Sequence, residues 1–144
     1  MRFRVSEQRT ASALLEELRV ELQELHAADV AACETTLLIH PWVLADFVEY
    51  NDFLDVCDST VMELGLEGEL QIASFHPQYQ FAATRADDIE NYTNRSPYPM
   101  LHILREASIE LAIAAVPDTA EIYRRNIRTL RDLGLEGWSR LWRD

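Results

Sequence analysis

The chain has 144 residues, a formal net charge of −12, 48% hydrophobic residues and 26% charged residues, and we expect residues 1–144 to form one globular domain. Because a field of that sign repels phosphate backbones and anionic lipid surfaces, nucleic acids and membranes are poor partners. All 13 basic residues are arginine, which excludes a lysine nucleophile and leaves arginine as the positive contact for an anion.

The first half of the chain alternates between strand and helix patterns. Residues 2–6 alternate polar and apolar side chains and predict a first strand. The helix that follows is capped by Ser6 or Thr10, and its apolar side chains form one stripe of leucines: Leu14, Leu15, Leu18, Leu22 and Leu25. The nearly continuous apolar run at 35–39 predicts a second strand, which Pro41 ends.

The second helix has the clearest helical pattern in the sequence. It is predicted to begin at Pro41 and to end at Gly65, which suits a left-handed cap. Its apolar residues recur at steps of three and four: Val43, Phe47, Tyr50, Leu54, Cys57, Val61 and Leu64. Residues 69–75 alternate again and predict a third strand that runs into His76.

The second half of the chain is predicted to be mainly helical. A polar connection over 82–95 leads to a third helix that Ser96 caps and that runs to about residue 115. A fourth helix follows, with Asp118 as its cap and Gly134 as its end. The tail carries Trp138 and Trp142, which we expect to dock on the domain or to support a homo-oligomer.

These elements predict an α/β fold. The β-α-β-α-β order favours a small, mainly parallel sheet of three or four strands followed by two C-terminal helices. A ferredoxin-like α+β arrangement is the alternative. A charged start rather than a signal peptide, and the lack of a run of about 20 apolar residues, predict a cytoplasmic protein.

Three of the four histidines are candidates for one site. His40 and His76 each precede a proline at the end of a predicted strand, and ligands of open α/β sheets bind at that edge. His102 and Glu106 lie four residues apart on the predicted third helix and so share a face. Together they would suit zinc or a similar divalent metal. The alternative is that two histidines only end their strands and that the other pair is an ordinary surface pair.

An anion could bind beside these histidines. Arg95 and Arg105 flank the start of the predicted third helix, and a helix N-terminus with nearby arginines favours negative charge. Tyr79 and Tyr98 could add hydroxyl groups. The alternatives are that the arginines pair with the acidic residues of 87–90 and that the tyrosines only pack.

Four motifs make the chain similar to a known family. They lie at residues 37–42, 46–54, 71–81 and 91–106, and they resemble a bacterial family catalogued as domain of unknown function 1415. The resemblance implies no established activity or cofactor. Members usually begin earlier, with a segment that contains a Leu-Cys-Pro motif, whereas Met1 here stands at the first strand.

The sequence leaves three classes of function open. The preferred one is a small enzyme that uses His40, His76 and His102, through a metal or general acid–base catalysis, on an anionic small molecule. The others are a non-catalytic module for a metal or anion and a protein-interaction domain. The first two predict that the histidines converge in a pocket. The third predicts scattered histidines and an exposed apolar patch.

Overall fold

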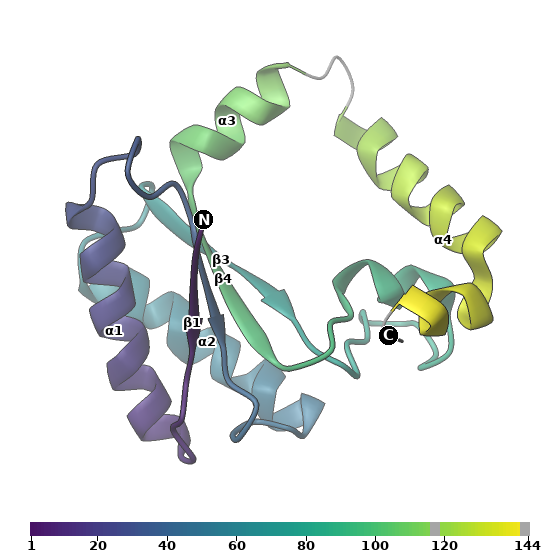
Figure 1. Cartoon of the computed structure of the whole chain (residues 1–144), viewed down its shortest axis with the longest axis horizontal. Helices are drawn as coiled ribbons and strands as arrows, with labels where there is room; N and C mark the ends of the chain where they lie inside the picture. The colour runs from purple at the N-terminus through teal and green to yellow at the C-terminus, as the bar shows by residue number, and fades with distance from the viewer. Residues whose placement is uncertain (116–118, 142–144) are drawn as a thin grey trace.

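The computed structural model describes residues 1–115 and 119–141. One sheet has the strand order β1-β2-β4-β3. Its strands are β1 (Arg2–Val5), β2 (Thr36–Ile39), β3 (Leu70–Phe75) and β4 (Met100–Arg105). The helices are α1 (Ala11–Ala27), α2 (Phe47–Glu63), α3 (Glu106–Ala114) and α4 (Thr119–Leu141), with the 3-10 helix η1 (Ile89–Asn94). Figure 1 shows α1 and α2 packed on one side of the sheet and α3 and α4 reaching out on the other.

The sheet is mixed, so the prediction of a mainly parallel sheet is wrong. The strands predicted at 2–6, 35–40 and 69–76 do share one sheet. However, only β1 and β2 pair in parallel, whereas β4 pairs antiparallel with both β2 and β3. β4 therefore separates the two strands that a crossover would have made parallel neighbours. The parallel β1–β2 pair also distinguishes this sheet from the wholly antiparallel ferredoxin-like alternative.

The fourth strand replaces the first part of the helix predicted from Ser96. Its side chains alternate between buried and partly buried positions, with Leu101 and Ile103 on the buried side. A residue that precedes proline is disfavoured in helical geometry, and Tyr98 precedes Pro99. That signal opposes a helix beginning at residue 96, and α3 begins only where β4 ends.

The hydrophobic core lies between α1, α2 and one face of the sheet. The leucine stripe of α1 is confirmed, since four of its five members have no exposed surface. Phe47 and Leu54 of the predicted α2 stripe are only partly buried. The main members of the core are Leu14, Leu18, Leu22, Leu25, Leu38, Tyr50, Phe53, Cys57, Val61, Leu70, Leu101 and Ile103.

Side-chain caps decide where the first two helices begin. Thr10 caps α1 as predicted, because its hydroxyl accepts a hydrogen bond from the Ala13 amide at 3.2 Å. Asp46 caps α2 in the same way, because its carboxylate accepts a hydrogen bond from the Glu49 amide at 3.0 Å. The second helix thus begins later than the predicted position at Pro41, and residues 41–46 form a loop over the end of the sheet.

The C-terminal helix packs against η1 rather than on the sheet. Gly134 breaks its helical geometry with a φ of 69°, at the residue where the sequence predicted a helix end. Beyond this break, the Trp138 ring packs edge-on against Tyr92 of η1, with centroids 5.5 Å apart. The predicted cap Asp118 and the tail residue Trp142 lie outside the described residues.

Candidate functional site

His40 and His76 lie together at one end of the sheet. β2 and β3 both run antiparallel to β4, so their carboxyl ends reach the same edge. The two imidazoles pack against the ring of Tyr50, with centroid distances of 5.9 Å and 4.8 Å. Neither histidine has exposed surface. The expected convergence of these two strand ends therefore occurs, but inside the core.

The ring nitrogens of His76 are both engaged with backbone. The amide of Gln78 donates to Nδ1 at 3.0 Å, and Nε2 lies 3.0 Å from the carbonyl oxygen of Leu44. Because Nδ1 accepts, the proton of the neutral ring must be on Nε2, which donates to Leu44. Burial lowers the pKa of His76 and favours this neutral form.

His40 makes a matching contact with the same loop. Its Nδ1 lies 3.0 Å from the carbonyl oxygen of Val43, which can only accept, so Nδ1 carries the proton. Within the described residues its buried Nε2 has no hydrogen-bond partner. Burial lowers the pKa of His40 as well. Both histidines thus hold the 41–46 loop, in which Leu44 has an unusual φ of 61°.

His102 lies on the opposite face of the sheet from the other two histidines. It sits on β4 between Leu37 and Ala73 and not on a helix, so the predicted helical pairing with Glu106 is wrong. Burial lowers the pKa of His102. Its Nε2 atom is buried without a hydrogen-bond partner in residues 1–115 and 119–141.

Arg105 and Glu106 lie at the far end of β4, away from the paired histidines. The Arg105 guanidinium donates to three carbonyl oxygens at the end of α1 and the loop after it, those of Leu25, Ala28 and Cys33, at 2.8–3.0 Å. This arginine therefore satisfies a helix C-terminus. The backbone amide of Glu106 bonds to the carbonyl oxygen of Glu69, where α3 begins.

Arg95 and Tyr79 do lie near the buried histidines. Arg95 donates to the carbonyl oxygens of Tyr79 and Ala86 and stacks over Tyr92 at 4.2 Å. The Tyr79 ring packs against Phe47, which also contacts His76. These contacts order the 77–95 connection. Tyr98, by contrast, is 54% exposed.

The predicted metal site does not form in the part of the chain that the structure describes. No group of three or more His, Cys, Asp or Glu side chains there is placed to hold a metal ion. The set of His40, His76, His102 and Glu106 is divided between two faces and two ends of the sheet.

The face of the sheet that carries His102 is free of Asp, Glu and Arg. Directly paired residues share a face, so the registers place ten side chains here: Phe3, Val5, Leu37, Ile39, Gln71, Ala73, Phe75, Met100, His102 and Leu104. We call this set the open face. At its β1 edge, Phe3 and Val5 are 64% and 65% exposed. An exposed apolar surface of this kind is a candidate binding surface.

A cavity extends from the open face towards the C-terminal helices. It has a volume of about 450 Å³ and is lined by residues of β3, η1, α3, α4 and the 76–94 connection: Phe75, Phe81, Thr93, Asn94, Ile113, Ile122, Tyr123 and Asn126. All of these side chains are uncharged. In a chain with 25 acidic residues, a cavity of this composition favours an apolar occupant.

The comparison with known families gives one match. The model of a family described as "Protein of unknown function (DUF1415)" matches residues 1–140. The chain belongs to the DUF1415 family. No curated protein and no solved structure matches it. The family assignment made from the central motifs is therefore confirmed, and the geometry of this DUF1415 chain is the basis for a functional proposal.

Sequence reasoning missed the open face because it missed β4. Residues 100–105 were assigned to a helix. Alternate residues do not share a face in a helix, so Met100, His102 and Leu104 were not recognised as one surface. The predicted third helix does exist from Glu106 onward as α3. No helix in the described part of this DUF1415 chain is long and apolar enough to cross a membrane.

Proposed function

We propose that this protein is a non-catalytic interaction module that binds a second copy of itself through the open face and α3. The observation that carries the proposal is the presence of two exposed, mostly apolar surfaces on one chain. One is the open face, and the other is α3, none of whose residues is buried. His102 lies apart from the buried pair His40 and His76, and an exposed apolar surface is what an interaction domain predicts.

Catalysis by the histidines receives less support. A general base must come within hydrogen-bond reach of its substrate, yet His40 and His76 have no exposed surface. His76 also uses both ring nitrogens on backbone groups. His102 lies on the other face of the sheet, so the three imidazoles offer no shared substrate position.

The α3 helix supplies the apolar side chains for the contact. Leu111 is 74% exposed and Ile113 is 46% exposed. No residue separates α3 from β4, since Arg105 ends the strand and Glu106 begins the helix. Figure 1 shows α3 leaving the end of β4 and pointing away from the sheet. Within its own chain, α3 borders the open face only at the cavity that Ile113 lines with Phe75, and Leu111 stays 74% exposed.

Charge complementarity favours a second copy as the occupant. The α3 helix carries Glu106 and Glu110 and no basic residue. The α4 helix borders the cavity beside the open face and carries five arginines and three acidic residues. The rest of the chain carries eight arginines and twenty-two acidic residues, so α4 is the basic part of the molecule. A partner's acidic α3 placed beside the basic α4 would relieve the self-repulsion expected of a chain with net charge −12.

The contact would be reciprocal. Each copy carries both the projecting α3 and the open face that receives it, so a two-fold axis satisfies both surfaces at once. An amphipathic or apolar helix laid into a hydrophobic groove is a common recognition mode. We propose the closed pair because it covers both surfaces of each copy, whereas an open chain of copies would leave one of each exposed at its ends.

Sedimentation equilibrium of the whole chain tests the proposal. We expect a monomer–dimer equilibrium, and we expect Leu111→Glu to weaken dimerisation by about tenfold or more because it places an unpaired charge in an apolar contact. Val5→Glu, at the receiving surface, should weaken it similarly.

Val20→Glu is the matched control for these variants. Val20 is 49% exposed on α1, on the other side of the sheet, and its replacement adds the same charge. The dimer should persist in this variant. A chain that is monomeric at every concentration, or a dimer that Leu111→Glu and Val5→Glu leave intact, would contradict the proposal.

A further inference from the structure

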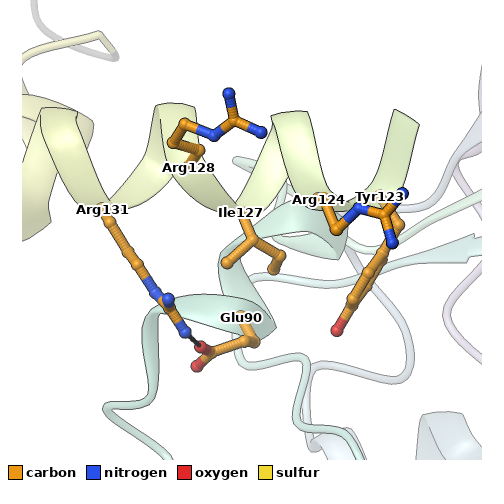
Figure 2. A pocket seen from close by; sticks show the side chains of 6 residues that line it. All are labelled: Glu90, Tyr123, Arg124, Ile127, Arg128 and Arg131. Carbon is orange, nitrogen blue, oxygen red and sulfur yellow. Dashed lines mark hydrogen bonds and ion pairs between the residues drawn. The ribbon is translucent and has the colours of Figure 1, made fainter. Parts of the chain in front are cut away.

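A second cavity lies on α4 and is lined by three arginines. It has a volume of about 440 Å³. Its walls are Glu90 of η1 and five residues of α4: Tyr123, Arg124, Ile127, Arg128 and Arg131. Figure 2 shows Arg131 reaching to Glu90 at one end, Tyr123 and Arg124 at the other, and Ile127 between them. Arg128 leaves the helix away from Glu90 in this view.

The arginines are held in place by exposed carboxylates. Arg131 pairs with Glu90 at 2.6 Å, and Glu121 pairs with Arg124 at 3.3 Å and with Arg128 at 3.5 Å. The hydrogen bond from Arg131 is the main cause that lowers the pKa of Glu90, so this carboxylate stays charged. Solvent-exposed ion pairs contribute little net free energy, so an incoming anion can compete for these guanidinium groups.

Arg128 and Arg131 have donors to spare for a ligand, whereas at Arg124 a ligand would exchange with the present contacts. Arginine carries five N–H donors in a planar fork, and one carboxylate contact uses at most two of them. Three arginines stand against two carboxylates here, Glu90 on the cavity wall and Glu121 beside it, so this region has a small local excess of positive charge in a chain of net charge −12. Attraction of an anion here must be local, because the long-range field repels it.

The shape of the cavity restricts the class of anion. A volume of about 440 Å³ is in the usual range for an organic ligand and far exceeds a single phosphate. Arg124 and Arg131 are seven residues apart, which is roughly 10 Å along a helix. Ile127 provides apolar surface between them, and the ring of Tyr123 lies at the Arg124 end. We infer that this cavity binds a small organic dianion, with an acidic group at each end of a partly apolar body.

This inference does not require self-association, although both proposals draw on the positive charge of α4. It assigns Arg124 and Arg131 to the two acidic groups and Ile127 to the body of the ligand. Among residues 1–115 and 119–141, Tyr123 alone lines both this cavity and the uncharged one beside the open face. Neither Leu111 nor Val5 lines the arginine cavity, so the dimer-weakening variants leave it intact.

Calorimetric titration with linear dicarboxylates tests the inference. At matched ionic strength, the full chain is titrated with succinate, suberate, sebacate and dodecanedioate, with octanoate as the monoanion and inorganic phosphate as the compact anion. Affinity should rise with length to an optimum near sebacate, and octanoate and phosphate should bind at least about tenfold more weakly, since each lost charge-assisted hydrogen bond costs roughly that factor.

Substitutions then place the binding. Arg124→Gln and Arg131→Gln should each weaken sebacate binding by about tenfold or more. Arg125→Gln is the control, because it removes the same charge from the same helix at a residue that does not line the cavity. Arg124→Gln leaves the Arg131–Glu90 pair intact, so its effect is separate from the attachment of α4 to η1.

Three results would overturn the inference. One is the absence of any dicarboxylate binding. Another is equal weakening by Arg125→Gln, which would indicate general attraction to α4. The third is equal affinity for sebacate and octanoate, which would show that only one acidic group is recognised. An unmodified chain that binds sebacate but is monomeric at every concentration would reject the proposed self-association alone.

Discussion

Replacing Tyr50 with phenylalanine is expected to lower the free energy of unfolding by about 2–4 kcal/mol. Tyr50 is fully buried on α2. Its hydroxyl donates to the carbonyl oxygen of Met100 at 2.8 Å and accepts from the amide of Phe75 at 3.0 Å. One side chain therefore satisfies backbone groups of two neighbouring strands and joins them to the helix. Phenylalanine would leave a donor and an acceptor without their partner.

Denaturant unfolding of the variant measures this loss. The dependence of the unfolding free energy on denaturant concentration should equal that of the unmodified chain, which shows that the unfolded state has not changed. Burial raises the pKa of Tyr50, so the hydroxyl stays protonated across the usual pH range. Tyr98→Phe is the matched control, because Tyr98 is 54% exposed and its change should stay within about 0.5 kcal/mol. A loss below about 1 kcal/mol for Tyr50→Phe would mean that the two hydrogen bonds are easily replaced.

The elements that could be predicted from the sequence are those with strong local signals. The leucine stripe of α1, the Thr10 cap and the left-handed Gly65 all follow from spacing or residue type, and each is found. β4 could not be assigned by periodicity, because six largely apolar residues satisfy a strand and a buried helix equally well. Pairing with β2 and β3 decides between a strand and a helix, and the sequence alone does not show which segments pair.

The candidate site was predictable only in part, for a related reason. The two His-Pro steps correctly place His40 and His76 at one edge of the sheet. Whether such an edge faces a ligand or the core depends on the loop that covers it, and here residues 41–46 cover it. Arg105 was assigned to an anion, whereas it bonds to carbonyl oxygens after α1 that lie far away in sequence.

The spacing of arginines in the sequence indicates the arginine cavity in part. Arg124, Arg128 and Arg131 recur at steps of four and three, so they share one side of α4. This basic side stands out in a chain with 25 acidic residues. What the spacing cannot supply is Glu90, which reaches the cavity from η1, more than thirty residues earlier in the chain.

The stability of the protein is expected to fall on mild acidification below pH 6.5, because burial lowers the pKa of three histidines: His40, His76 and His102. All three pKa values lie below the ordinary value of 6.5. Below pH 6.5 the unfolded chain therefore binds protons that the folded chain does not. Stability is unaffected above this pH and falls as the pH drops towards the folded pKa, by about 1.4 kcal/mol per pH unit for each histidine.

Measurement of unfolding free energies at several pH values checks the sign and the slope. The range stops at pH 5.5 because the raised pKa values of Glu21 and Asp58 act in the opposite direction near their own titration range. His76→Asn keeps an oxygen that can accept from Gln78 but removes one of three titrating rings, so it should reduce the pH dependence by about a third while lowering stability at pH 7.5. His40→Asn should reduce the slope likewise. A slope that neither variant changes would show that other groups take up the protons, and that the neutral pair beneath the 41–46 loop does not set the acid sensitivity of the fold.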